Sequence, residues 1–172
     1  NNIINIDKLS YASNLNALSD IETNNYNLIK IDLSNAKAIE KEIFKAKPDC
    51  IFHLAAETHV DRSIDSPDAF IASNIIGTYN LLTSTYKYWT KLSKIKKNAF
   101  RYIHISTDEV YGSLKKTEKS FDEINRYKPN SPYSASKASA DHLVRAWYKT
   151  YGLPSIITNT CNNYGPFQFP EK

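Results

Sequence analysis

The sequence lacks the residues that build a metal centre or a disulfide framework. Its two cysteines, Cys50 and Cys161, lie far apart and show neither a CxxC pair nor a Cys/His ligand spacing. Both lie in apolar, strand-like runs. We therefore expect two reduced cysteines in the core and no metal.

Long hydrophobic runs are also missing. No apolar stretch approaches the roughly 20 residues that a membrane span needs, and no signal-peptide pattern opens the chain. The formal net charge is +4, but the lysines are mostly scattered, as on an ordinary solvated surface. The one cluster, Lys91 to Lys97, suits the end of a helix. These features predict a soluble, cytoplasmic protein with no nucleic-acid or membrane partner.

Strand-like and helix-like stretches alternate along the 172 residues, which is about the length of one domain. This alternation predicts an α/β fold with a parallel sheet. We expect strands over 3–7, 28–32, 50–56, 100–107 and 155–161, and helices over 35–47, 67–92 and 131–151. The run over 50–56 is continuously apolar, which is typical of a strand covered on both faces. A polar loop is expected over 113–130.

Polar residues gather after each predicted strand. In open parallel sheets the ligand lies beyond the carboxyl ends of the strands. Each group alone could belong to an ordinary loop, but together they predict a binding crevice. The groups are Asp7-Lys8, Asp32, Glu57-Thr58, Thr107-Asp108-Glu109 and Asn162-Asn163.

Tyr133 and Lys137 are four residues apart and therefore share one face of the predicted helix. Tyrosine, with an ordinary pKa of about 10, is a poor base at neutral pH. A neighbouring ammonium and a cationic nicotinamide would favour its phenolate. The pair therefore predicts a base for hydride-transfer chemistry.

The acids of HISTDEVYG raise a geometric question, because consecutive strand residues point to opposite faces. Asp108 and Glu109 can reach one ligand only if the chain leaves extended geometry after Thr107. The alternative is that one acid is catalytic and the other belongs to a cap or turn.

Five stretches carry a resemblance to a known family. They are NIDKLSYASN, FHLAAETHVDRSI, HISTDEVYG, SPYSASKASADHLVRAWYKTYGLP and TNTCNNYGPFQFPEK. They resemble dTDP-glucose 4,6-dehydratases, nucleotide-sugar enzymes of the extended short-chain dehydrogenase/reductase superfamily. The resemblance implies a Rossmann-type doubly wound sheet, tightly bound NAD, and conversion of dTDP-glucose to dTDP-4-keto-6-deoxyglucose in deoxysugar or rhamnose synthesis.

The resemblance also implies catalytic roles. Tyr133 takes the proton of the C4 hydroxyl while NAD takes the C4 hydride, and Lys137 holds the ribose and lowers the pKa of the phenol. Thr107 hydrogen-bonds the C4 oxygen. Glu109 then removes the C5 proton, Asp108 protonates the departing C6 hydroxyl, and the hydride returns to C6.

For the cofactor, Asp7 after the first strand fits a carboxylate bonded to the adenosine ribose, which favours NAD over NADP. The adjacent Lys8 weakens that preference. By resemblance, further residues surround NAD: Leu9, Ser10, Asp32, Leu33, Leu54, Ala55, Ala56, Glu57, Thr58, Ser73, Tyr133, Lys137 and Asn163. By the same resemblance Thr58, Thr107 and Asn162 face the nucleotide sugar.

Two departures from the family pattern matter. The four glycines, Gly77, Gly112, Gly152 and Gly165, make no glycine-rich phosphate loop. The chain opens at what resembles the second strand and ends before most of the substrate-binding region. We therefore expect an internal fragment: a partial NAD-binding domain over 1–172 that reaches the substrate region near 162–172. Alone, it is expected neither to hold NAD tightly nor to turn over.

Alternatives remain at this point. A UDP-sugar 4-epimerase or UDP-glucuronate decarboxylase would need the Tyr133–Lys137 pair but no C6 acid, and a non-catalytic NAD-binding protein would need neither acid. As in similar enzymes, the helices over 67–92 and 131–151 are expected to form a homodimer face. Finally, His53 and His104 are expected in the core, with His59 in a loop and His142 on a helix surface.

Overall fold

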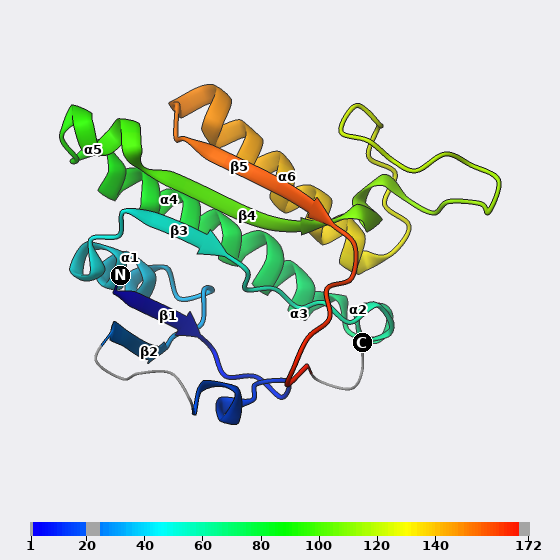
Figure 1. Ribbon diagram of the computed structural model, residues 1–172, viewed down its shortest axis with the longest axis horizontal. Helices are drawn as coiled ribbons and strands as arrows, with labels where there is room; N and C mark the ends of the chain where they lie inside the picture. The colour runs from blue at the N-terminus through cyan, green and yellow to red at the C-terminus, as the bar shows by residue number, and fades with distance from the viewer. Residues whose placement is uncertain (1, 20–24, 169–172) are drawn as a thin grey trace.

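The computed structural model describes residues 2–19 and 25–168, and it confirms an α/β fold with parallel strands. In Figure 1 the arrows of β1, β3, β4 and β5 point the same way, and β3, β4 and β5 lie in front of α4 and α6. The strands are β1 (Ile3–Asp7), β2 (Tyr26–Lys30), β3 (Cys50–His53), β4 (Arg101–Thr107) and β5 (Ser155–Thr160). The second strand therefore begins and ends two residues earlier than predicted, and the third is shorter.

Among the described residues the strands form two separate sheets, β1-β2 and β3-β4-β5. The register sets Ile3 against Tyr26 in the first sheet. In the second, Cys50 lies against Arg101 and Tyr102 against Ser155. Each sheet is parallel throughout, so all carboxyl ends within a sheet meet at one edge. Over residues 2–19 and 25–168, β1 and β3 share no partner strand.

The register also decides which strand residues meet the helices. Tyr102 and His104 of β4 are buried on the side of α4 and α6. Phe52 of β3 and Ile156 of β5 share the opposite face, and Phe52 is 62% exposed. Figure 1 shows α4 and α6 on a single side of this sheet. The prediction that residues 50–56 form a strand covered on both faces is therefore wrong for the described part of the chain.

The helices fall largely where the periodicity predicts them. Asn35 caps α1 (Ala36–Ala46) through its side chain, and Lys47 ends it in a left-handed conformation. The predicted helix over 67–92 is helical throughout most of its length, as α3 (Pro67–Phe70), the π-helical η3 (Ile71–Ile76) and α4 (Gly77–Thr90). Sequence periodicity missed four short elements: η1 (Leu15–Leu18), α2 (Val60–Asp65), α5 (Lys94–Ala99) and η4 (Asp108–Tyr111).

The helix α6 (Pro132–Tyr151) carries the predicted Tyr-Lys pair and has well-defined ends. Ser131 and Ser134 form a reciprocal capping box, and Pro132 occupies the first turn, where its missing N–H costs no helix bond. Gly152 ends the helix with φ of 72°, a left-handed conformation that glycine adopts without strain. The start of α6 is thus fixed close to the residues that matter for chemistry.

The main core lies between the helices and the buried side of the strands. It includes Ile39 and Ile43 of α1, Leu82 of α4 and Val144 of α6. Cys50 and Cys161 are free but exposed, so the prediction of core cysteines is wrong. Cys50, the first residue of β3, lies on the same open face as Phe52, and Cys161 lies just past the end of β5. Over the described ranges, no helix is both long enough and apolar enough to cross a membrane.

Candidate active site

The predicted polar groups do lie at or just beyond the carboxyl ends of the strands. Asp7 is the last residue of β1, and Asp32 follows β2 by two positions. Glu57 lies in the loop after β3, and Asp108 directly follows β4. Within the second sheet, the parallel register therefore gathers the groups after β3, β4 and β5 at one edge.

The backbone leaves extended geometry at the point that the two acids require. Thr107 is the last extended residue, with φ of −136° and ψ of 151°, and η4 begins at Asp108. The Thr107 Oγ1 accepts a hydrogen bond from the backbone N–H of Glu109 at 3.3 Å. This tight turn replaces strand alternation, so Asp108 and Glu109 are no longer forced to opposite faces of the sheet.

Tyr133 lies in the first turn of α6, 5% exposed, with its ring edge-on to Phe70 at 6.3 Å between centroids. Burial raises the pKa of Tyr133 to about 12, and a hydrogen bond with the Thr107 side chain lowers it in part. The carboxylates of Glu109 and Asp108 act in the raising direction. All three residues of the Thr107–Glu109 turn therefore influence the pKa of Tyr133.

Lys137 lies one helical turn further along α6 and is 4% exposed. Its Nζ donates a hydrogen bond to the backbone carbonyl of Ile105 in β4 at 2.7 Å. Burial lowers the pKa of Lys137 to about 8, against an opposing effect of Asp141. A buried lysine with so low a pKa is typical of a functional site.

On the β1-β2 side the acids make local turns. The Asp7 Oδ1 accepts from the backbone N–H of Leu9 at 2.6 Å, and Leu9 itself has a positive φ of 55°. The Asp32 Oδ1 accepts from the N–H of Ser34 at 2.8 Å, and this hydrogen bond lowers the pKa of Asp32. Both carboxylates therefore shape the loops in which the cofactor residues were predicted.

Two contacts join the loop after β1 to the rest of the molecule. Lys8 forms an ion pair with Glu57 in the loop after β3. Arg62 of α2 stacks on Tyr11, with its guanidinium carbon 3.7 Å from the ring centroid. Each contact joins a residue that follows β1, in the first sheet, to a residue that follows β3, in the second sheet.

Sequence reasoning missed Asn74, which lies in the π-helical segment η3 and is almost fully buried. Its side-chain amide accepts from the N–H of Glu57 and donates to the carbonyl of Glu57, at 2.8 and 2.9 Å. The same amide donates to the Ser136 Oγ at 2.8 Å. Asn74 therefore fastens the loop after β3 to the helix of Tyr133. A polar residue at a helix position that should face the core was the available signal.

The remaining predicted residues lie on the surface of this region. Leu54, Ala55, Thr58, Asn162 and Asn163 are exposed, whereas Ser10, Leu33, Ala56 and Ser73 are partly buried. The Asn163 Nδ2 donates to the Thr160 Oγ1 at 3.4 Å. Of the predicted start of the substrate region, residues 169–172 lie outside the described residues.

A second missed feature is a buried polar group behind Lys137. His53 and His104 are buried as predicted, and their Nδ1 atoms lie 3.0 Å apart. The Nε2 of His104 is 3.2 Å from the Oδ1 of Asp141, which is itself buried. Burial lowers the pKa of both histidines, so both are neutral at neutral pH. His59 caps α2, and His142 is exposed on α6, in agreement with the predictions.

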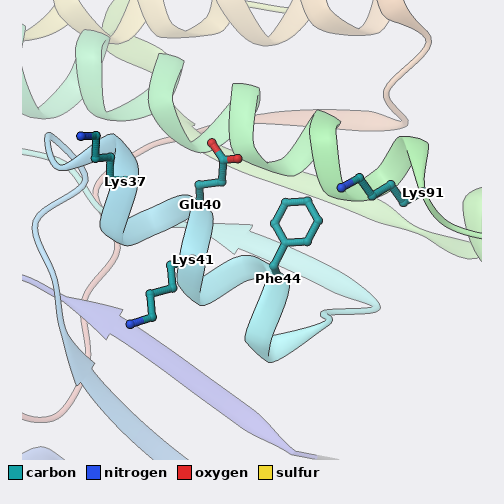
Figure 2. Close-up of a pocket in the computed structure, with 5 residues that line it drawn as sticks. All are labelled: Lys37, Glu40, Lys41, Phe44 and Lys91. Carbon is teal, nitrogen blue, oxygen red and sulfur yellow. The ribbon is translucent and has the colours of Figure 1, made fainter.

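An open groove elsewhere on the surface is unrelated to these residues. Figure 2 shows it between α1 and the end of α4, lined by Lys37, Glu40, Lys41, Phe44 and Lys91. Glu40 is engaged by Lys87 at 2.6 Å, and the Lys91 ammonium lies 4.7 Å from the centre of the Phe44 ring. None of the predicted site residues lines it. No group of His, Cys, Asp and Glu suited to hold a metal ion occurs among residues 2–19 and 25–168.

The fold is that of a Rossmann-type domain, and α6 carries Tyr133 and Lys137 in the spacing expected for a short-chain dehydrogenase/reductase. The family model described as GDP-mannose 4,6 dehydratase matches residues 1–172, and the chain belongs to this family.

Individual relatives agree with this assignment. The chain is 56% identical over 179 residues to the dTDP-glucose 4,6-dehydratase of Salmonella typhimurium, covering 99% of this chain and 50% of that protein. It resembles the solved dTDP-glucose 4,6-dehydratase DesIV of Streptomyces venezuelae with NAD and TYD bound: TM-score 0.88, 40% identity, 99% of this chain and 49% of that one. A UDP-glucose 4-epimerase of Thermus thermophilus in complex with NAD is similar at TM-score 0.82 and 26% identity, covering 97% and 49%. The chain thus spans about half the length of the relatives it matches.

Proposed function

We propose that the protein is an NAD-dependent dTDP-glucose 4,6-dehydratase, a lyase that forms dTDP-4-keto-6-deoxyglucose for deoxysugar or rhamnose synthesis. One observation carries the proposal: the turn Thr107-Asp108-Glu109 lies against Tyr133, whose pKa responds to all three side chains. A hydroxyl donor, two carboxylates and a buried phenol are the groups that this reaction needs. The identity of 56% to a protein named for this activity supports the same assignment.

The chemistry explains why both acids are needed. Losing water across C5 and C6 of a hexose is difficult until C4 is oxidised, because a ketone at C4 acidifies the C5 hydrogen. NAD, when bound, would accept the C4 hydride in that oxidation and would return it to C6 after water is lost. Tyr133 takes the C4 hydroxyl proton and Thr107 holds the C4 oxygen. Glu109 removes the C5 proton, and Asp108 gives a proton to the departing C6 hydroxyl. A positioned acid or base of this kind contributes about 10²- to 10⁴-fold in rate.

The tyrosine must lose its proton far below its pKa of about 12 in the free site. Two positive charges would favour the phenolate: the ammonium of Lys137, one turn away, and the nicotinamide ring of the bound cofactor. Lys137 also has donors left for a ribose hydroxyl, because an ammonium carries three N–H groups and Ile105 accepts only one. The pair is therefore expected to work only with the cofactor in place.

The residues after β1, β2 and β3 fit a dinucleotide. Asp7 lies at the end of β1, where a carboxylate meets a ribose in such folds, and a negative charge there disfavours a 2′-phosphate. Leu54 and Ala55 leave an exposed apolar strip after β3, against which flat rings would pack. Together with Leu9, Ser10 and Asp32, these residues form the cofactor side of the proposed site, and Asn162 and Thr58 the sugar side. A cytoplasmic location belongs to the same proposal and rests on composition.

The homodimer is proposed for the surface of α4 and α6. Tyr79 packs edge-on against Trp147 at 5.9 Å, and Tyr86 lies 5.1 Å from Tyr151, so aromatic rings run along both helices. Tyr79 and Tyr151 remain 46% exposed. An exposed aromatic surface of this kind favours association of two copies. Sedimentation of the full-length protein as a monomer at micromolar concentration would refute the dimer.

The function is tested by incubating the full-length protein with dTDP-glucose and following the product by NMR. A dehydratase gives a C6 methyl group and a C4 ketone. The epimerase alternative, to which the fold similarity of 26% identity points, gives a C4 epimer with no methyl signal. Parallel incubation with UDP-glucose tests the nucleotide base. Epimer formation, or no reaction with either sugar nucleotide, would refute the proposal.

A further inference from the structure

Asp141 is a buried carboxylate that the reaction itself does not use. It lies on α6, one helical turn beyond Lys137 and two beyond Tyr133, and is 1% exposed. Its Oδ2 accepts from the Ser106 Oγ at 2.8 Å and from the Tyr127 hydroxyl at 2.9 Å. The Asn159 Nδ2 donates to the same oxygen at 3.3 Å.

The surroundings are those of a charged carboxylate. Three donors from β4, from the loop before α6 and from β5 converge on one oxygen, which an ionised carboxylate accepts readily. Burying such a charge is costly unless it is well paired. An apolar side chain here would leave the donors of Ser106, Tyr127 and Asn159 without this acceptor. A neutral amide oxygen could accept from them as well, so hydrogen bonding alone does not require the charge of Asp141.

The charge of Asp141 acts on Lys137. The two residues are four positions apart on one helix, which brings their side chains to the same face. Burial works against the ammonium of Lys137, and the negative charge of Asp141 is the influence that opposes it. The Lys137 Nζ is at the same time held by the carbonyl of Ile105 at 2.7 Å.

The other groups around Asp141 do not compete for this role. His104 of β4 approaches its Oδ1, and this hydrogen bond raises the pKa of His104, but burial has the larger effect and lowers the pKa of both His104 and His53 behind it. Burial and Asp141 together raise the pKa of Tyr127, which stays a neutral donor. Tyr102 beside the histidines is likewise neutral, because burial raises its pKa. Among the described groups whose pKa responds to Asp141, Lys137 is therefore the one that carries positive charge at neutral pH.

Tyr133 also responds to Asp141. The negative charges of Glu109, Asp108 and Asp141 all raise the pKa of Tyr133, after the larger effect of burial. The pKa of Tyr111, on η4, is also raised, by burial first and to a smaller extent by Glu123, Asp141 and Asp122. The charge of Asp141 thus reaches both members of the tyrosine–lysine pair.

We propose that Asp141 is a positioning residue that keeps the ammonium of Lys137 charged inside the protein and so sets the pH range in which Tyr133 and Lys137 work together. The inference rests on the proposed function. It assigns the role to charge rather than to packing, and this distinction makes it testable.

The test is the pH profile of kcat/KM for dTDP-glucose in full-length Asp141→Asn, which keeps the shape of the side chain and removes its charge. Without the charge, Lys137 loses its proton at lower pH, so the alkaline limb moves down. Tyr133 ionises more readily while Lys137 is still charged, so the acid limb moves down as well. We expect both limbs to shift by about one pH unit, the usual size of the effect of one nearby charge.

Two further variants separate charge from structure. Tyr127→Phe removes one donor to Asp141 but keeps the carboxylate, so its limbs should stay at the wild-type pH. Asp49→Asn makes the same chemical change at an exposed position before β3 and should match the wild type. Lower activity of Asp141→Asn with unshifted limbs, or an equal shift in Tyr127→Phe, would overturn the inference. If the wild type itself does not convert dTDP-glucose, the proposed function fails instead.

A measurement without turnover decides the case in which Asp141→Asn does not fold. The Lys137 side chain of the wild-type protein is titrated by NMR with labelled lysine, the signal being assigned from Lys137→Arg. We expect a pKa near the value of about 8 that the structure gives. Loss of the Lys137 proton below neutral pH would overturn the inference, because Asp141 would then fail to keep the ammonium charged.

Discussion

The two sides of the candidate site are built in different ways. Around β4, β5 and α6, polar side chains are buried and bonded across long stretches of sequence, as Ser106 is to Asp141 and Lys137 to Ile105. Around the ends of β1 and β2, the carboxylates of Asp7 and Asp32 each bond to a backbone N–H two residues further on. The first side is fixed by tertiary contacts and the second mainly by local turns.

This difference suits the chemistry that each side is proposed to perform. Proton and hydride transfers require reacting atoms to be held within a fraction of an ångström, which buried and mutually bonded side chains achieve. Nucleotide binding spreads over many weaker contacts, and loops that adjust around the ligand suffice. The comparison predicts that substitutions on the catalytic side change activity and stability strongly, whereas those on the nucleotide side have smaller effects.

The largest effect is expected for Lys137→Met. It should abolish turnover, and it should also stabilise the protein, because burial holds the pKa of Lys137 at about 8 rather than 10.5. At 1.36 kcal/mol per pKa unit, the charged form is disfavoured in the folded state by about 3 kcal/mol.

Because the pKa of Lys137 is lower in the folded than in the unfolded state, the destabilisation depends on pH. Below about pH 8 both the folded and the unfolded state carry the proton, so the full penalty is present. As pH rises from about 8 toward 10.5, the folded protein has lost its proton and the penalty disappears. Denaturant melts of variant and wild type should therefore differ most near neutral pH and converge at high pH. Lys94→Met, at an exposed position of α5, is the control. A variant less stable than the wild type at neutral pH would contradict this account of Lys137.

An intermediate effect is expected for Asn74→Ala, which removes the link between the loop after β3 and α6. The substitution removes three hydrogen bonds and leaves the backbone N–H and carbonyl of Glu57 unsatisfied, a loss of about 2 to 4 kcal/mol in unfolding free energy. Affinity for NAD should fall as well, because the loop after β3 is released. Asn98→Ala, exposed on α5, should change neither quantity. Unchanged stability together with unchanged affinity would mean that Asn74 does not hold the loop after β3 against α6.

The smallest effect is expected for Lys8→Ala, on the nucleotide side. Its ion pair with Glu57 is partly exposed, with side-chain exposures of 32% and 16%, so solvent screens it. We expect a loss of at most about 1 kcal/mol, diminishing at high salt. Chemical denaturation at low and high ionic strength measures it. A salt-independent loss of several kcal/mol would show that this side is held as firmly as the other.

Sequence patterns predicted the strand positions and the Tyr133–Lys137 pair because these depend on short-range periodicity. Alternation in β4 and the four-residue spacing in α6 are readable from the chain alone. The requirement for a turn after Thr107 followed from strand geometry, and η4 meets it. The sequence also predicted the end of α1 at Lys47, its C-cap, because Pro48 disfavours a helical conformation in the residue before it.

Other features depended on tertiary contacts that no local pattern contains. Asn74 and Asp141 matter because of partners far away in the sequence, such as Glu57 for Asn74 and Asn159 for Asp141. Cys50 and Phe52 read as core residues but are exposed, because the pattern of a strand does not reveal which of its faces is covered. The short helices α2 and α5 were missed because six residues hold too little periodicity to detect.

The central proposal is that Glu109 and Asp108 act after oxidation at C4, Glu109 as the base at C5 and Asp108 as the acid at C6. It is tested most directly by rapid mixing of full-length Glu109→Gln, loaded with NAD, with dTDP-glucose. The variant keeps Tyr133 and Lys137 but lacks the C5 base, so NADH should accumulate on the enzyme while no water is lost. Tyr133→Phe, run in parallel, should show no NADH. Normal turnover by Glu109→Gln, or no NADH from it, would contradict the account.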